Sequence, residues 1–397
     1  MNPSRLKTCL DSVLDQCVHR HGGVPGVVAM ATDRRGNFYE GAAGTRELGQ
    51  DRPMTTDAVF AIFSTTKALA GTCILQLIEE GKINLTDPAK MYAPEIGDLQ
   101  VLEGFDANGQ PRTRRPKRDI TIDDLMLHTS GLSYECFSAD DLKYRTAKSV
   151  PGIVSCTFEA IRSVLLHDPG ERWTYGVSID WLGRIVERQR GKRLGEVMQE
   201  RIFGPLGMQD IAFHMSEPMK ARRVSMHKRS AGGQLTPLPD MMLPQPPAMD
   251  CGGHGLYATV GEYMKFIRMI LNDGSGPNGR VLKPETVALM ARDGLSALGL
   301  SSGAWASSIP ALSNSGEFFP GLGKGWSYTF MTNRERAPSG RAAGSLMWAG
   351  LANCFYWIDR ASGIGGYWAT QILPFQDCAS YPGFVEFETA VYHHQSG

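Results

Sequence analysis

The stretch Val59-Phe60-Ala61-Ile62-Phe63-Ser64-Thr65-Thr66-Lys67 joins a short apolar segment to a helical pattern. A helix is expected over 67–80, because apolar side chains recur there at helical spacing and Gly81 provides a stop. The face expected to be buried consists of Leu69, Cys73, Leu77 and Ile78. Ser64 and Lys67 stand three residues apart where this helix starts, so their side chains face the same side.

This pair predicts a nucleophile and its base. The positive potential of a helix N-terminus and burial both disfavour a charged lysine. A neutral Lys67 can accept the proton of the Ser64 hydroxyl. The S-x-x-K pattern also occurs by chance, and the alternative interpretation of Ser64 is a solvated helix cap.

Strand patterns occur at both ends of the chain and helical patterns in the middle. Strands are expected at 26–32, 38–43, 326–331, 345–358 and 366–373, and helices at 6–18, 123–128, 181–190, 259–272 and 384–393. The simplest topology joins both ends in one antiparallel sheet flanked by helices, with a mainly helical insertion. The predicted fold class is therefore α/β (α+β). The predicted division is a sheet domain of residues 1–60 plus 255–397 and a helical domain of residues 61–254, with the active site at their interface.

Two later segments add groups suited to the same chemistry. Residues 169–178 form a turn-rich loop that contains Tyr175, which can pass protons if a cation lowers its pKa. A core tyrosine is the alternative. Residues 345–351 have strand character with Gly350 inside, and a glycine there suggests close approach by a ligand or another backbone. A backbone N–H from this strand could join that of Ser64 in an oxyanion hole.

The order Ser64-x-x-Lys67, Tyr175, Trp348-Ala349-Gly350 resembles the serine β-lactamase and penicillin-binding protein superfamily. It is most similar to the family VIII carboxylesterases, which are related to class C β-lactamases. Supporting segments are His128-Thr129-Ser130-Gly131-Leu132, Asp87-Pro88 and Gly252-Gly253-His254-Gly255-Leu256. The resemblance implies a β-lactamase-like fold with Ser64 as the acylated nucleophile, Lys67 as its base and Tyr175 as acid and base. It also implies an oxyanion hole made by the backbone N–H groups of Ser64 and Leu351.

Two departures from the superfamily favour esters over β-lactams. Trp348-Ala349-Gly350 stands where Lys-Thr-Gly is common, and it lacks the cation and hydroxyl that would hold a substrate carboxylate. An arginine elsewhere could replace that cation. Val177 stands where an asparagine is often found. The substrate-binding residues expected from the resemblance are Trp348, Ala349, Gly350, Val177 and His254.

Another motif competes for the role of nucleophile. Gly299-Leu300-Ser301-Ser302-Gly303 satisfies G-x-S-x-G, which in α/β-hydrolases needs a strand before it and a helix after it. Its flanks are rich in Ser and Gly, so a flexible loop is expected. His128 is expected to close a turn and to be structural.

Composition limits the partners. The 41 basic and 41 acidic residues balance, which leaves no field to attract nucleic acid or a membrane surface. The basic run 112–118 is expected to be a solvated loop. The N-terminus lacks the apolar core of a secretory signal, and the eight cysteines show no C-x-x-C, so free thiols and a cytoplasmic location are expected. No His/Cys spacing fits a metal site and no cofactor is expected.

These patterns together predict a serine hydrolase that cleaves small, short-chain carboxylic esters through an acyl-enzyme on Ser64. The alternatives are a β-lactamase, an amide hydrolase or an acyltransferase of the same superfamily, or a sensor that is acylated once and does not turn over. The expected partner is a small-molecule ester, and the oligomeric state is left open, a homo-oligomer included.

Overall fold

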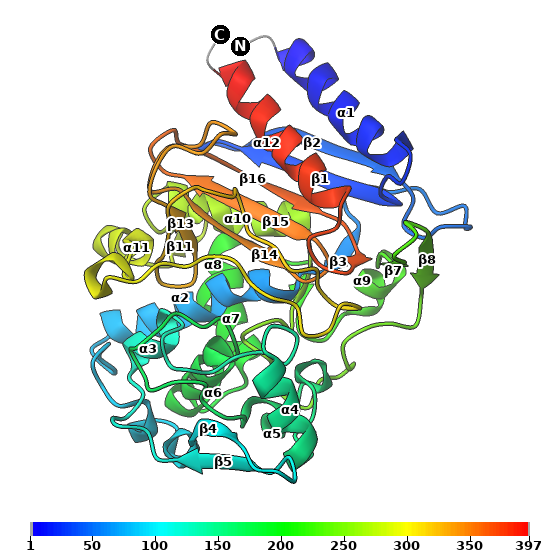
Figure 1. The fold of residues 1–397 in the computed structure, drawn as a ribbon. Helices are drawn as coiled ribbons and strands as arrows, with labels where there is room; N and C mark the ends of the chain where they lie inside the picture. The colour runs from blue at the N-terminus through cyan, green and yellow to red at the C-terminus, as the bar shows by residue number, and fades with distance from the viewer. Residues whose placement is uncertain (1–2, 396–397) are drawn as a thin grey trace.

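The structure is a computed structural model that describes residues 3–395, and its centre is a seven-stranded antiparallel sheet (Figure 1). In spatial order the strands are β12 (Lys324–Trp326), β13 (Met331–Asn333), β14 (Leu346–Gly350), β15 (Cys354–Asp359), β16 (Ile364–Ala369), β1 (Gly26–Thr32) and β2 (Asn37–Gly44). The C-terminal strand β16 pairs with β1 so that Ala369 lies opposite Val28. The predicted fold class, with both ends of the chain in one antiparallel sheet, is confirmed.

Two predicted strands are in fact hairpins. The segment 326–331 is divided by a turn in which the Ser327 N–H donates to the Phe330 carbonyl at 2.8 Å. The segment 345–358 is divided after Gly350, at a turn where Asn353 has a φ of 61°. Asparagine tolerates this left-handed conformation. The alternation in 326–331 runs straight through its turn, and 346–358 is a nearly continuous apolar run, so the pattern alone predicted single strands.

Helices cover both faces of the sheet. Helices α1 (Pro3–His19) and α12 (Ser380–Gln395) lie side by side on one face, and α10 (Val260–Leu271) packs against β1 and β16 (Figure 1). Every residue of β1 is buried, as expected of a strand covered on both sides. Among residues 3–395, no helix combines the length and the apolar character that crossing a membrane requires.

The helix that follows Ser64 is α2 (Thr66–Glu79), and it is buried on all sides from Thr66 to Leu77. The sequence predicted a single buried face that included Ile78, which is half-buried. The difference arises because α2 packs against α6 (Ser178–Arg190), α7 (Leu194–Met198) and α11 (Pro284–Ala291). A helix that is enclosed by other elements needs no polar face.

The elements between α2 and α6 include a hairpin that the sequence did not predict. The strands are β4 (Val101–Phe105) and β5 (Pro111–Arg114), and the helices are α3 (Ile122–Met126), α4 (Ala139–Lys148) and α5 (Phe158–Ile161). The expected solvated loop 112–118 is therefore partly a strand. It is also not simply solvated, because Arg114 and Arg118 form ion pairs with the buried carboxylates of Asp168 and Asp124.

Small sheets connect the remaining segments. One contains β17 (Ile372–Leu373), β7 (Met226–Arg229) and β8 (Leu235–Leu238), and another contains β3 (Val59–Ala61), β9 (Tyr257–Thr259) and β6 (Ile211–Ala212). The other short elements are α8 (Gly204–Leu206), α9 (Glu217–Ala221), β10 (Ser275–Gly276) and β11 (Gly279–Arg280). The pairing of β3 with β9 brings the Gly-rich segment 252–256 next to the segment that leads into Ser64. The division into residues 1–60 plus 255–397 and residues 61–254 stays a prediction.

Candidate active site

Ser64 lies in a tight 3₁₀ turn, Phe63–Thr65, between β3 and α2. Phe63 has a φ of 42°, a left-handed conformation that a bulky side chain rarely adopts. Such backbone strain persists where the surrounding structure enforces it, and it is common at functional sites. The turn places Ser64 in the lining of a cavity.

Lys67 is completely buried one helical turn after Ser64. Its Nζ lies 3.2 Å from Ser64 Oγ, 2.8 Å from the Tyr134 hydroxyl and 2.8 Å from the Gly253 carbonyl oxygen. Burial lowers the pKa of Lys67 to about 7, although the Asp180 carboxylate acts in the opposite direction. The neutral amine therefore has a substantial population near neutral pH.

The hydrogen-bond partners of Lys67 determine where its N–H groups and its lone pair point. The Gly253 carbonyl can only accept, and the Tyr134 hydroxyl can donate its own proton to Asp180 Oδ2, 3.4 Å away. A neutral amine has two N–H groups and one lone pair. With the two N–H groups directed to Gly253 and Tyr134, the lone pair faces the hydroxyl of Ser64. This arrangement prepares Lys67 to accept the serine proton.

Tyr134 and Asp180 were missed by the sequence reasoning. Tyr134 stands two residues after the segment 128–132, which was noted only as a supporting pattern. Asp180 lies in the first turn of α6, where an acidic residue is also common as a helix-terminal charge. Neither residue carries a local signal that connects it to Lys67, because only the tertiary fold brings them together.

Tyr175 lies in the same cavity lining as Ser64. Burial raises its pKa well above the ordinary value, and hydrogen bonds with Ser64 and Trp348 oppose that shift. The condition stated from the sequence, a pKa of Tyr175 lowered by a cation, is therefore not met. Lys67 Nζ lies over the ring, 4.6 Å from its centroid, and Tyr175 remains a protonated phenol that can donate its hydrogen.

Trp348 reaches Tyr175 from β14, and its indole N–H donates to the Tyr175 hydroxyl at 2.9 Å. Two residues later the strand passes very close to the segment that leads into Ser64. A Cβ on Gly350 would lie 2.3 Å from the carbonyl oxygen of Ile62, so only glycine fits there. This agrees with the close backbone approach expected at Gly350. Ala349, Gly350 and Leu351 line the cavity beside Ser64.

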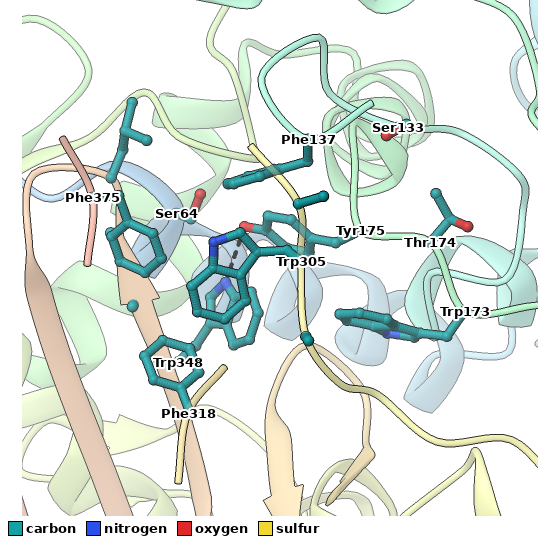
Figure 2. Close-up of a pocket in the computed structure, with 15 residues that line it drawn as sticks. Ser64, Ser133, Phe137, Trp173, Thr174, Tyr175, Trp305, Phe318, Trp348 and Phe375 are labelled. Atoms are coloured by element: carbon teal, nitrogen blue, oxygen red, sulfur yellow. Dashed lines mark hydrogen bonds between the residues drawn. The ribbon is translucent and has the colours of Figure 1, made fainter. Parts of the chain in front are cut away.

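The cavity over Ser64 has a volume of about 220 Å³ and is mostly aromatic (Figure 2). Its large side chains are Phe137, Trp173, Tyr175, Trp305, Phe318, Trp348 and Phe375. No charged side chain is among the described residues that line it. An arginine in place of the missing superfamily lysine is therefore not found in this lining.

Three residues singled out from the sequence lie outside this lining. Val177 is fully buried where α6 begins, and His254 is buried behind Lys67, with its Nδ1 3.5 Å from Asp180 Oδ1. His128 is buried against the Tyr175 ring, and its carbonyl accepts from the N–H of Thr174 at 2.8 Å. Its position supports the Tyr175 loop, in keeping with the structural role expected for it.

The competing motif 299–303 is an irregular loop that follows a 3₁₀ turn, Ser296–Leu298. Ser301 is exposed and does not line the cavity. A nucleophile elbow requires a strand directly before the serine and a helix directly after it, and the loop 299–303 has neither.

A second cluster lies behind Lys67 and was not predicted. Cys156, Cys251 and His254 are all buried, and their possible ligand atoms lie within 4.8 Å of one another. The sequence predicted no His/Cys grouping suited to a metal, because Cys156 is contributed by a segment about 95 residues before Cys251 and His254.

Comparisons with known proteins agree with this geometry. The Beta-lactamase family model matches residues 10–382. An uncharacterized protein of Mycobacterium tuberculosis is 36% identical over 281 residues, which is 69% of each chain. Lovastatin esterase of Penicillium rubens is 32% identical over 373 residues, covering 89% of this chain and 90% of the relative. The solved LovD6 mutant of simvastatin synthase from Aspergillus terreus aligns with a TM-score of 0.85 at 28% identity, covering 100% of this chain and 98% of the other.

Proposed function

The chain belongs to the β-lactamase family, within its serine hydrolase and acyltransferase members, and we propose that it is a carboxylesterase that cleaves small, short-chain esters. The observation that carries this proposal is the environment of Lys67. The two N–H groups of the neutral amine donate to the Gly253 carbonyl and the Tyr134 hydroxyl, and its lone pair faces the hydroxyl of Ser64.

The proposed reaction has two halves. Lys67 accepts the proton as Ser64 Oγ attacks the ester carbonyl, and the backbone N–H groups of Ser64 and Leu351 stabilise the oxyanion. Tyr175 donates its proton to the leaving alcohol and is reprotonated from Lys67. In the second half, water loses a proton to the same pair and attacks the acyl-enzyme, which releases the acid and regenerates Ser64.

The lining of the cavity supports a small, uncharged acyl group. A volume of about 220 Å³ is below the ~300–1,000 Å³ that is typical of drug-sized ligands. Aromatic walls favour apolar acyl chains, whereas a β-lactam or a peptide stem carries a carboxylate that this lining leaves without a cation. We therefore propose that esters are preferred as substrates over β-lactams and amides.

Acyl transfer is the second candidate. A relative from Aspergillus terreus that is 33% identical over 278 residues is described as monacolin J acid methylbutanoyltransferase. Hydrolysis and transfer share the acyl-enzyme and differ only in whether water or another nucleophile accepts the acyl group. The aromatic lining supports this candidate as well, because it would favour an apolar alcohol over water near the acyl-enzyme.

The test is steady-state hydrolysis of p-nitrophenyl butyrate by the wild type, Ser64→Ala and Ser301→Ala. We expect multiple turnovers in the wild type and Ser301→Ala, and a loss of about 10³-fold or more in Ser64→Ala. A single burst without turnover would instead indicate the acyl sensor. Added butanol would divert the product to butyl butyrate if transfer dominates, and a chromogenic cephalosporin turned over faster than the ester would contradict the proposed preference.

The free state of all eight cysteines supports a further part of this proposal, a reducing, cytoplasmic location. The assays should therefore contain a reductant. Activity that requires oxidised protein would contradict this location.

A further inference from the structure

The cluster of Cys156, Cys251 and His254 has the chemistry of a metal site. Two thiolates and an imidazole are soft and borderline ligands, which select Zn²⁺ or Cu⁺ over Mg²⁺ and Ca²⁺. We infer that these three residues bind a thiophilic d¹⁰ cation, Zn²⁺ or Cu⁺, at a buried site separate from the catalytic cavity.

The distances fit one shared ion without a large rearrangement. The three ligand atoms lie within 4.8 Å of one another, and Cys156 Sγ is 3.7 Å from His254 Nε2. Bonds of ~2.3 Å to sulfur and ~2.0–2.1 Å to nitrogen at a tetrahedral angle separate the two ligand atoms by about 3.6 Å. The observed separation therefore already matches one edge of a zinc tetrahedron.

The carboxylate of Asp180 orients the imidazole of His254. His254 Nδ1 faces the buried Asp180 Oδ1 at 3.5 Å, and within residues 3–395 no other acceptor pairs with it. Asp180 Oδ1 is itself held by the N–H of Gly253 at 2.8 Å. A carboxylate behind Nδ1 keeps the hydrogen there and leaves the Nε2 lone pair for a metal, as in many zinc sites.

The backbone around the cluster is fixed. Cys156 has a φ of 51°, unusual for cysteine, and its carbonyl accepts from the N–H of Met249 at 2.9 Å. Cys251 and His254 share a tight turn in which the His254 N–H donates to the Cys251 carbonyl at 3.2 Å. These contacts hold the two cysteine segments together before any ion binds.

A surface groove is lined by chain neighbours of the cluster. Its lining includes Thr157, Ala248 and Met249, and Thr157 and Met249 stand one and two residues from Cys156 and Cys251 in the chain. None of the three cluster residues lines the aromatic cavity over Ser64. The fourth coordination position would be left to water or another small ligand.

The test measures binding directly on the reduced full-length chain. Zn²⁺ is titrated in competition with a chromogenic chelator, and Cd²⁺ is titrated while the thiolate-to-cadmium charge-transfer absorbance is followed. We expect one tight equivalent in the wild type, and at least a 100-fold loss of affinity in both Cys156→Ala and Cys251→Ala.

Cys136→Ala is the matched control, because Cys136 is another buried free cysteine outside the cluster. It should bind Zn²⁺ like the wild type. The inference is overturned if the reduced wild type binds no tight equivalent, if both cluster variants keep it, or if Cys136→Ala loses it equally. Should Cys251→Ala fail to fold by circular dichroism, the wild type and Cys156→Ala still decide the question.

Discussion

Replacing Tyr134 with Phe tests the hydrogen-bond assignment around Lys67. The change removes only a hydroxyl, which lies 2.8 Å from Lys67 Nζ and 3.4 Å from Asp180 Oδ2. One N–H of the buried amine then loses its acceptor, and the remaining hydroxyl acceptor among residues 3–395 is Ser64 Oγ, 3.2 Å away. Turning that N–H toward Ser64 points the lone pair away from the serine proton. To react, Lys67 must leave one buried donor unsatisfied.

The expected cost follows from that unsatisfied donor. An unpaired buried polar group costs roughly 1–3 kcal/mol, which corresponds to a loss in kcat/KM of about 5- to 150-fold. The assay is ester hydrolysis between pH 5 and 9, with thermal unfolding measured in parallel. Tyr257→Phe is the matched control, because the Tyr257 hydroxyl is also buried but accepts from the Leu243 N–H at 2.9 Å, whereas Lys67 is hydrogen-bonded to Ser64, Tyr134 and Gly253. Full activity in Tyr134→Phe, or an equal loss in Tyr257→Phe, would refute the reasoning.

Three further outcomes are expected. Lys67 must be neutral to act as the base, and its pKa is about 7. We therefore expect kcat/KM to fall about tenfold per pH unit well below pH 7 and to level off above it. A flat profile down to pH 5 would exclude Lys67 as the base. Trp348→Phe removes the indole N–H that donates to the Tyr175 hydroxyl at 2.9 Å. It should lower kcat by about 2- to 10-fold with little change in melting temperature. An unchanged kcat would mean that the indole N–H does not position Tyr175. Gly350→Ala places a Cβ 2.3 Å from the Ile62 carbonyl oxygen and should lower kcat. Gly303→Ala, at a half-buried position where the added Cβ meets open space, should leave kcat and KM unchanged, and equal rates in the two variants would show that the close approach is unimportant.

The parts of the site that could be predicted are those with a local pattern. Ser64 and Lys67 meet because they are one helical turn apart, and the sheet follows from apolar strands at both ends of the chain. The contacts that orient Lys67 could not be predicted, because they come from segments that are distant in the sequence. The Gly253 carbonyl reaches it through the pairing of β3 with β9, about 200 residues apart in sequence, and a backbone oxygen has no signature in a side-chain pattern. The left-handed Phe63 was equally invisible, because nothing in its residue type indicates a positive φ.

The exchange of a superfamily lysine for Trp348 changes two properties of the site together. A cation at that position would attract the carboxylate of a substrate, and it would also stabilise a deprotonated Tyr175. The indole removes the positive charge but retains one N–H, which it donates to the Tyr175 hydroxyl. Burial then keeps Tyr175 protonated, so that it can act as a hydrogen donor to a leaving alcohol. Alkoxide leaving groups need such a proton, and a neutral ester needs no cationic anchor. The same substitution therefore accounts for both the uncharged cavity and the acid–base role proposed for Tyr175, and it is consistent with the proposal that Lys67 withdraws the proton from Ser64.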